Sequence, residues 1–285
     1  MLDITKILEA LDRFIMSNPT EDYHVFIEKD DRQRPYLGLS GLGEKCLRKV
    51  WYQWRHAAKP VFPPRMLRLF RRGDREEFVM CWMLRGIGFE IFEVDEQGKQ
   101  FSVRDFENHL KGNLDGVAKI PAEFWLSGQK PTPLLTEYKT VNDKGFQKFV
   151  KEGVEKTNPK YYGQMQGYCG YMGLKGALFI AVNKNDDDLY IEFVPAKKNK
   201  FSALVDKAQA VIESQEPPER MQYASLSWYE CRYCDFKDIC FKKAKAQRVC
   251  RTCKFAEPTL NGSWLCTKGH QYGEVCKDYK DITQV

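Results

Sequence analysis

The stretch LLTEYKT, from Leu134 to Thr140, combines the residue types of a buried strand with two charged side chains. Side chains alternate between the two faces of a strand, so Glu137 and Lys139 are expected to project from the same side, beside Leu135. A carboxylate and an ammonium on one face of an otherwise apolar strand need a reason, because unpaired buried charge is costly. A metal ion for the carboxylate and an anionic substrate for the lysine would supply it.

A second candidate metal ligand, Asp115, lies upstream in the stretch GNLDG, residues 112–116. The dipeptide Asp-Gly is typical of hairpin turns, which is the purely structural interpretation. Valine, alanine and isoleucine follow it, and this pattern also suits one continuous strand over residues 110–120 with a glycine bulge. The residues alone leave both interpretations open.

Composition narrows the class of protein. The chain has 285 residues, of which 43% are hydrophobic, so it can bury a full core and carry a small appendage. It contains no long uncharged apolar run, so we expect no membrane span. Its first residues, MLDITK, include an early acid, so we do not expect secretion. We therefore expect a cytoplasmic protein of a bacterium or a phage-infected cell. The net charge of +6 fits a nucleic-acid partner without requiring one.

The first part of the chain is expected to be helical. Helices are predicted over residues 3–17, from Ser40 through Cys46 and Trp54, and over residues 65–84. The last of these carries four arginines between Met66 and Glu76, which would form either a phosphate-binding edge or an ordinary solvated face. Glu77, in the same helix, would by itself be a surface carboxylate.

The rest of the core alternates strands and helices. Strands are predicted at residues 89–94, 100–103, 110–120, 134–140, 176–182 and 189–194, and helices at 143–153, 158–174 and 200–214. Asn158 and Pro159 are typical of a helix start. Four glycines of that helix indicate very close packing, and Gln164 and Tyr168 beside them form either a polar edge of the core or a substrate contact.

A first cysteine group has three members near the end of the core, Cys231, Cys234 and Cys240. Reduced thiols clustered in a cytosolic chain are more typical of metal ligands than of disulfides. Three thiolates cannot complete a four-coordinate site, so the isolated Cys46 is the natural fourth ligand, although a buried packing thiol would also explain it. Iron–sulfur clusters and zinc both accept four sulfurs, and the spacing does not choose between them.

A second cysteine group occupies the last part of the chain. Its spacing, two residues, then twelve, then nine, matches a small zinc-ribbon-like module, and its members are Cys250, Cys253, Cys266 and Cys276. His270 could replace one of the last two ligands. A module this small has little core, so the metal would supply much of its folding free energy. Cys81 and Cys169 stand alone within helices and are expected to be packing thiols.

Four short motifs occur in an order that resembles the PD-(D/E)XK nucleases. They are Gly73-x3-Glu77, Leu114-Asp115-Gly116, Glu137-Tyr138-Lys139 and Gln164-x3-Tyr168. More narrowly, the chain resembles the RecB-like branch, which includes phage exonucleases and CRISPR-associated exonucleases with an iron–sulfur cluster. In that branch one cysteine precedes the nuclease core and three follow it, as Cys46 and the first cysteine group do here. The resemblance covers roughly residues 40–241 and leaves the last 45 or so outside.

The resemblance implies a restriction-endonuclease-like α/β core, a mixed sheet flanked by helices, with an iron–sulfur clasp and a small C-terminal zinc-binding module. It implies that Mg²⁺ or Mn²⁺ is bound by three carboxylates and one backbone carbonyl, those of Glu77, Asp115, Glu137 and Tyr138, and that Lys139 is the catalytic lysine. Gln164 and Tyr168 would border the site. Leu114 stands where the family motif has proline, and position 77 is histidine in some relatives, which leaves the metal preference open.

The activity that the resemblance implies is phosphodiester hydrolysis of DNA by an exonuclease, in recombination, repair or phage replication, with a recombinase or a helicase as partner. Carboxylate and carbonyl oxygens agree with this independently, because they are hard ligands suited to Mg²⁺ and Mn²⁺. The alternative is a non-catalytic nucleic-acid-binding protein on a degenerate nuclease scaffold with two zinc sites. We expect the nuclease core over residues 1–225, the iron–sulfur segment over 226–245 and the zinc module over 246–285.

Overall fold

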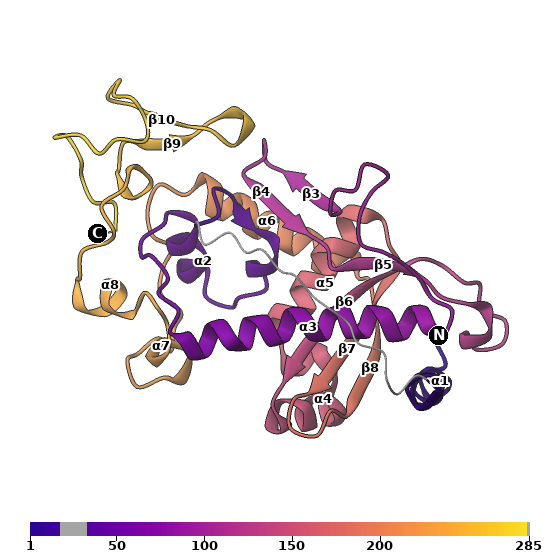
Figure 1. The fold of residues 1–285 in the computed structure, drawn as a ribbon. Coiled ribbons are helices and arrows are strands. Elements are labelled where there is room, and N and C mark those ends of the chain that lie inside the picture. Colours follow the sequence, from indigo (N-terminus) through magenta and orange to yellow (C-terminus); the bar gives the residue numbers. More distant parts are fainter. Residues whose placement is uncertain (18–32, 284–285) are drawn as a thin grey trace. The chain divides into compact units, whose positions relative to one another are not determined.

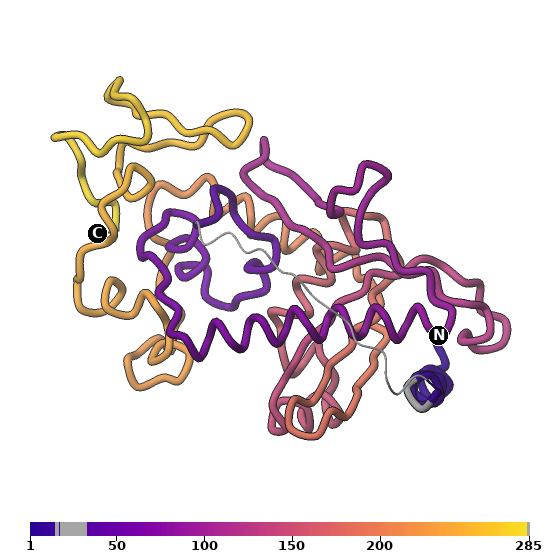
Figure 2. Tube along the Cα trace, in the orientation of Figure 1, coloured from indigo at the N-terminus to yellow at the C-terminus, as the bar shows by residue number. Residues whose placement is uncertain are grey.

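The computed structural model describes residues 1–17 and 33–283 of the chain (Figure 2). These residues form two compact units. The first comprises residues 1–17, 62–103 and 113–201, and the second comprises residues 33–61, 104–112 and 202–283. Every residue of the four nuclease-like motifs belongs to the first unit, and every cysteine of the two groups belongs to the second.

The first unit is built on a five-stranded mixed sheet, in the order β2-β5-β6-β7-β8 (Figure 1). The strands are β2 (Glu90–Phe92), β5 (Gly116–Lys119), β6 (Leu134–Val141), β7 (Gly176–Asn183) and β8 (Leu189–Pro195). The β6–β7 pair is parallel, with Glu137 opposite Phe179, and the other three pairs are antiparallel. β6 therefore has a hydrogen-bonded neighbour on each edge, and the mixed α/β class predicted from the sequence is confirmed.

Helices flank this sheet. They are α1 (Ile4–Ser17), α3 (Pro64–Gly86), α4 (Asp143–Thr157) and α5 (Pro159–Met172), and α3 crosses the sheet (Figure 1). The main core of the unit joins α1, the second half of α3 and one face of the sheet, through residues such as Ile7, Leu84, Leu134 and Ile180. On β6 and β7, residues two apart share a face, so Leu134 and Tyr138 belong to this core. The alternate residues, Glu137 among them, point to the other face.

Local capping explains where two of these helices begin. The side chain of Asn142 accepts a hydrogen bond from the Gly145 amide at 3.0 Å at the start of α4. Asn158 does the same for the Tyr161 amide at 3.2 Å at the start of α5, as the sequence predicted. α5 ends at Met172 because Gly173 adopts a left-handed conformation with φ of 65°, so Gly173 caps the helix instead of lying inside it.

The prediction of a single strand over residues 110–120 is wrong. Two strands occupy that stretch, β4 (Leu110–Asn113) and β5, and they belong to different sheets. The break falls at Leu114 and Asp115. Leu114 is fully buried and its amide donates to the Phe101 carbonyl at 3.0 Å, which takes the backbone out of the β5 ladder. The break leaves Asp115 at the N-terminal edge of β5 instead of in the middle of a strand.

The second unit surrounds α2 (Leu47–Trp54), which carries the buried aromatic residues Trp51, Tyr52 and Trp54. The helix expected from Ser40 begins only at Leu47, because Cys46 is extended and caps it. The other elements are β1 (Leu37–Gly38), α6 (Lys198–Glu213), which begins in the first unit, α7 (Tyr229–Arg232), α8 (Lys237–Lys242), and the antiparallel pair β9 (Ala256–Pro258) and β10 (Trp264–Cys266). β4 lies between β1 and β3 (Ser102–Asp105) in a small three-stranded sheet. No helix among the described residues is long and apolar enough to cross a membrane.

Candidate active site

β6 places Glu137 and Lys139 on one face, as the alternation of the sequence predicts. Glu137 has no exposed surface, and its carboxylate forms an ion pair with the Lys139 ammonium. The second carboxylate oxygen accepts a hydrogen bond from Gln164 Nε2, on α5, at 2.9 Å. A buried carboxylate is therefore held between a cation from its own strand and an amide from the neighbouring helix, which fixes its orientation.

The Lys139 ammonium contacts three oxygen-bearing groups at once. Besides its ion pair with Glu137, Nζ donates to the Tyr138 carbonyl at 2.8 Å and lies 3.8 Å from Asp115 Oδ2. These are three of the four groups that the family resemblance implies as metal ligands. The same Asp115 oxygen lies 3.5 Å from the Tyr138 amide, so the start of β5 and the middle of β6 meet at this point. The arrangement gathers cation-binding oxygens around one positive charge.

Glu77 reaches the same region from α3. Burial, with a further contribution from nearby Asp115, raises the pKa of Glu77 to about 8, while Lys139 opposes the change. Burial and Asp115 likewise raise the pKa of Glu137 to about 8. Burial raises the pKa of Asp115 as well, against the effect of Lys139. Burial alone would lower the pKa of Lys139, but Glu137 and Asp115 raise it above its usual value. One fully buried and two partly buried carboxyl groups thus lie within electrostatic range of one lysine, and a divalent cation would offset both the cost of their burial and their repulsion.

The donor set fits Mg²⁺ or Mn²⁺ in kind, because carboxylate and carbonyl oxygens are the ligands that these ions prefer. The spacing is wider than that of a closed site. Within residues 1–17 and 33–283, one trio of histidine, cysteine or carboxylate ligand atoms lies within 4.8 Å of one another, and it is His270, Cys276 and Asp278 of the second unit. The ligand atoms of Glu77, Asp115 and Glu137 are therefore not all within 4.8 Å of one another, and a shared ion would have to bring them closer together.

The helix α5 forms the wall beside these groups. Gln164 contacts Glu137 directly, and Tyr168 is buried one turn further along the same helix, so its role beside the site stays a prediction. The Tyr161 ring, one turn before Gln164, lies 5.4 Å from Lys139 Nζ and was missed from the sequence. Its only sequence signal is the three-residue spacing to Gln164, which places both on one helix face.

The arginines of α3 are spread over its exposed part. Arg68, Arg71 and Arg75 are exposed, whereas Arg72 lies 3.6 Å from Glu76 and 3.5 Å from Asp187 in ion pairs. A phosphate-binding edge on this helix stays a prediction, with Arg72 already partly neutralised.

Comparisons with known proteins add structural likenesses at low identity. No protein-family model matches the chain, and no curated protein matches it. Among solved structures, the protein SSO0001 is 18% identical, with a TM-score of 0.43, over 85% of this chain and 98% of its own. The alkaline exonuclease LHK-Exo from Laribacter hongkongensis is 14% identical, with a TM-score of 0.41, over 62% of this chain and 86% of its own. The complex of LHK-Exo with dAMP is 15% identical, with a TM-score of 0.44, over 64% of this chain and 88% of its own. At these values the likenesses do not decide what this chain does, so its function is argued from the site.

The first cysteine group lies in the second unit and includes Cys46. Burial raises the pKa of the Cys231 thiol, and the nearby thiols of Cys46 and Cys240 raise it further. Burial and Cys46 likewise raise the pKa of Cys234. The structure therefore brings Cys46, which is far away in the sequence, into electrostatic range of Cys231 and Cys234, and Cys231 is in turn within range of Cys240. Four thiols of one group fit a four-sulfur centre, and its metal stays a prediction.

The second cysteine group lines one small cavity. All four cysteines border it, together with His270 and Tyr272, and its volume is about 20 Å³. His270 Nε2 lies 2.7 Å from Asp278 Oδ2, and both belong to the trio with Cys276 described above. The cavity is large enough for one water-sized occupant or one ion, and cysteine sulfur is a preferred ligand of Zn²⁺.

The lone cysteines are placed differently. Cys81 on α3 and Cys169 on α5 are both buried, and burial raises the pKa of each thiol to about 12. Thiols with raised pKa values are poor nucleophiles, which agrees with packing roles.

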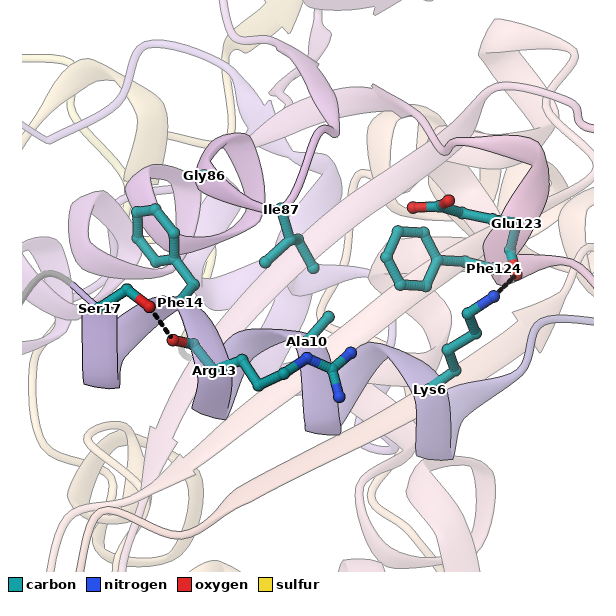
Figure 3. A pocket seen from close by; sticks show the side chains of 9 residues that line it. All are labelled: Lys6, Ala10, Arg13, Phe14, Ser17, Gly86, Ile87, Glu123 and Phe124. Atoms are coloured by element: carbon teal, nitrogen blue, oxygen red, sulfur yellow. Dashed lines mark hydrogen bonds between the residues drawn. The ribbon is translucent and has the colours of Figure 1, made fainter.

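An open depression of about 400 Å³ lies elsewhere in the first unit, beside α1 (Figure 3). Lys6, Ala10 and Phe14 of α1 face Ile87 and Phe124 across it, and Arg13 lies along its rim (Figure 3). No residue of the four nuclease-like motifs lines it. The depression is therefore separate from the carboxylate–lysine site.

Proposed function

We propose that this chain is a divalent-metal-dependent deoxyribonuclease that hydrolyses phosphodiester bonds, acting from DNA ends as an exonuclease. The observation that carries the proposal is that Asp115, Glu137 and the Tyr138 carbonyl all lie close to the Lys139 ammonium. Glu77 lies within electrostatic range of them. Structural ion pairs rarely bury three carboxyl groups around one lysine, whereas a cation-assisted hydrolase needs such a cluster.

In this mechanism Glu77, Asp115, Glu137 and the Tyr138 carbonyl would hold Mg²⁺ or Mn²⁺. When bound there, the ion would supply a water of lowered pKa and charge neutralisation at the scissile phosphate. Lys139 orients the attacking water or stabilises the negative charge that develops on the phosphate oxygens. Gln164 keeps Glu137 in a single orientation through its hydrogen bond at 2.9 Å. Carboxylates bind the ion when deprotonated, so the raised pKa values of Glu77 and Glu137 imply that metal binding strengthens as the pH rises toward 8.

We also assign a 4Fe-4S cluster to Cys46, Cys231, Cys234 and Cys240, which supports the structure of the second unit. The support for it is the grouping of the four thiols together with their one-before, three-after order in the chain. Protein purified without oxygen should be brown with broad visible absorption. Colourless protein that carries zinc at these cysteines would replace the cluster with zinc. Recombination, repair or phage replication is the proposed setting, with a recombinase or helicase as partner.

The decisive experiment is a cleavage assay on end-labelled single- and double-stranded DNA with Mg²⁺ or Mn²⁺. We expect the wild type to cut linear DNA, Lys139→Ala to lose cleavage, and Lys144→Ala, an exposed lysine of α4, to retain it. Covalently closed circular DNA in the same assay distinguishes exonuclease from endonuclease action. DNA binding measured in Ca²⁺ should be equal for all three proteins. A wild type that binds DNA but never cuts it would instead support the non-catalytic nucleic-acid-binding protein.

A further inference from the structure

Two arginines are buried together in the second unit. Arg55, at the end of α2, has no exposed surface, and Arg251, in the tight turn of the second cysteine group, is 5% exposed. Arg55 donates to the carbonyls of Ala256 at 2.9 Å and Ser214 at 3.2 Å, and Arg251 donates to the Trp54 carbonyl at 3.1 Å. The hydrogen-bonding needs of the guanidinium groups are thus met largely by neutral carbonyls.

No carboxylate in the described part of the chain lies within 4.0 Å of either guanidinium, and Glu257 acts on Arg55 only from further away. The Trp264 ring supplies part of the compensation, since the guanidinium carbons lie 5.0 Å (Arg55) and 4.7 Å (Arg251) from its centre. Carbonyls and rings do not cancel a net charge of two. Burying two cations side by side is costly unless an anion is close.

The cavity of the second cysteine group is the neighbour that provides such an anion. Tyr272 lines this cavity and is at the same time within electrostatic range of Arg251. The Cys253 thiol, which also lines the cavity, lies within electrostatic range of Arg55. Arg251 itself stands between Cys250 and Cys253 in the sequence. The buried arginines and the four cysteines therefore form one continuous cluster.

We propose that Cys250, Cys253, Cys266 and Cys276 hold one Zn²⁺ as a tetrathiolate, and that this dianionic centre is the counter-charge of the buried Arg55–Arg251 pair. Four thiolates and Zn²⁺ carry a net charge of −2, which equals the two guanidinium charges in magnitude. A site with one histidine in place of a thiolate would carry only −1. The charge balance thus favours four sulfurs, with His270 held beside Cys276 by Asp278.

The consequence is that zinc binding and the docking of residues 250–283 onto α2 are thermodynamically coupled. The docking contacts run through the same residues: the Trp264 and Trp54 rings lie 4.9 Å apart, and Arg251 bonds the Trp54 carbonyl. Without the dianionic centre, the two buried guanidinium groups would lose its counter-charge and the docked form would lose stability. This inference concerns the second unit and does not depend on the proposed nuclease activity.

The first test removes zinc from the full-length wild-type protein with a chelator and follows amide hydrogen exchange. We expect amides of β9 and β10, and those of the C-terminal end of α2, to exchange at least tenfold faster, and to recover when Zn²⁺ is returned. Metal analysis should show the loss of one zinc per chain. Exchange at β9, β10 and α2 that does not change on zinc removal would overturn the proposal.

The second test measures zinc affinity by competition with a chromophoric chelator. Arg251→Gln removes one buried charge and should weaken zinc binding at least tenfold, whereas Arg251→Lys keeps the charge and should weaken it less. Lys254→Met is the matched control, because it removes a positive charge beside Cys253 from an exposed side chain and should change affinity less than twofold. Equal affinities for Arg251→Gln and Lys254→Met would overturn the proposal, and this comparison remains informative if Arg251→Gln is less stable.

The third test identifies the ligands with Co²⁺ in place of zinc. The visible spectrum of a tetrathiolate should be unchanged in His270→Gln and lost in Cys266→Ser. A spectrum that shifts in His270→Gln would show a nitrogen ligand and would overturn the four-sulfur centre.

Discussion

At the scale of single residues, the unusual feature is that Lys139 contacts the same oxygens that would hold a cation. Its ammonium pairs with Glu137, approaches Asp115 and donates to the Tyr138 carbonyl. In the proposed mechanism this single positive charge would have two effects: it would assist catalysis, and it would compete with the ion for the same oxygen acceptors. Replacing it separates the two effects.

The variant Lys139→Met should therefore lose cleavage by about 100-fold or more, because charge on the phosphate is no longer stabilised. Its affinity for Mn²⁺ should be equal to that of the wild type or tighter, because a competing cation has gone. Electron paramagnetic resonance of free Mn²⁺ measures this affinity without DNA. A variant that binds Mn²⁺ more weakly than the wild type would mean that Lys139 supports the ion instead of competing with it.

The pH dependence follows from the raised pKa values of Glu77 and Glu137, both about 8 in the folded protein against an ordinary 4.5. Because the folded-state values are raised, their contribution to stability is fully present below pH 4.5 and is lost as the pH rises through 8. In chelator, the free energy of unfolding should fall between pH 6 and pH 8 by up to about 1.4 kcal/mol per pH unit for each such group, and Tm should be lower at pH 9 than at pH 6.

Saturating Mn²⁺ should reduce this fall, since the ion stabilises the ionised carboxylates, and metal affinity should rise over the same pH range. Glu137→Gln removes one titrating group and should make the fall in chelator less steep. A Tm in chelator that rises from pH 6 to pH 9 would contradict the burial argument.

At the scale of elements, helix α5 is packed so closely at Gly170 that a larger residue does not fit there without a shift. A Cβ at Gly170 would lie 2.1 Å from the ring of Phe201, whereas a Cβ at Gly73, inside α3, would have Thr140 Oγ1 as its nearest neighbour at 3.9 Å. Gly170→Ala should destabilise the protein by about 1–3 kcal/mol through overpacking. Gly73→Ala, the matched change in an open helix, should stabilise it by up to about 1 kcal/mol.

Urea unfolding measures both changes. The double variant Gly170→Ala/Phe201→Ala should recover part of the overpacking cost, because the methyl group then replaces ring atoms. If Gly170→Ala and Gly73→Ala shift stability equally, the close approach of α5 to Phe201 is not the cause.

Elements whose ends depend on local chemistry were predictable from the sequence. α1 and α5 begin and end close to the expected residues because periodicity and the Asn158-Pro159 start are local signals. The prediction of one strand over residues 110–120 failed because strand pairing is not local. The Asp-Gly turn pattern does not reveal that β4 and β5 belong to different sheets. The site residues on β6 followed from alternation alone. Tyr161 was missed because a tyrosine on a buried helix face is ordinarily a core residue.

At the scale of the whole molecule, the two proposed kinds of metal site are divided between the two units. The proposed oxygen ligands lie in the first unit and all eight grouped cysteines lie in the second. We expect Cys46→Ser to lose the iron of the proposed cluster and its visible absorption, while one zinc per chain remains. Cys81→Ser, a buried thiol outside both groups, is the control and should retain both metals.

Metal analysis and absorption spectra of protein purified without oxygen measure both outcomes. Loss of zinc together with iron in Cys46→Ser would mean that the two cysteine groups of the second unit do not load independently.

The central position of β6 has a consequence for how such a molecule can diversify. β6 is hydrogen-bonded to β5 along one edge and to β7 along the other, so any change that shifts its backbone disturbs both ladders. Insertions are tolerated far better in the connections, such as residues 93–101 and 121–133. Related sequences can therefore acquire new substrate preferences through changes in those connections, while the proposed site residues on β6 keep their positions.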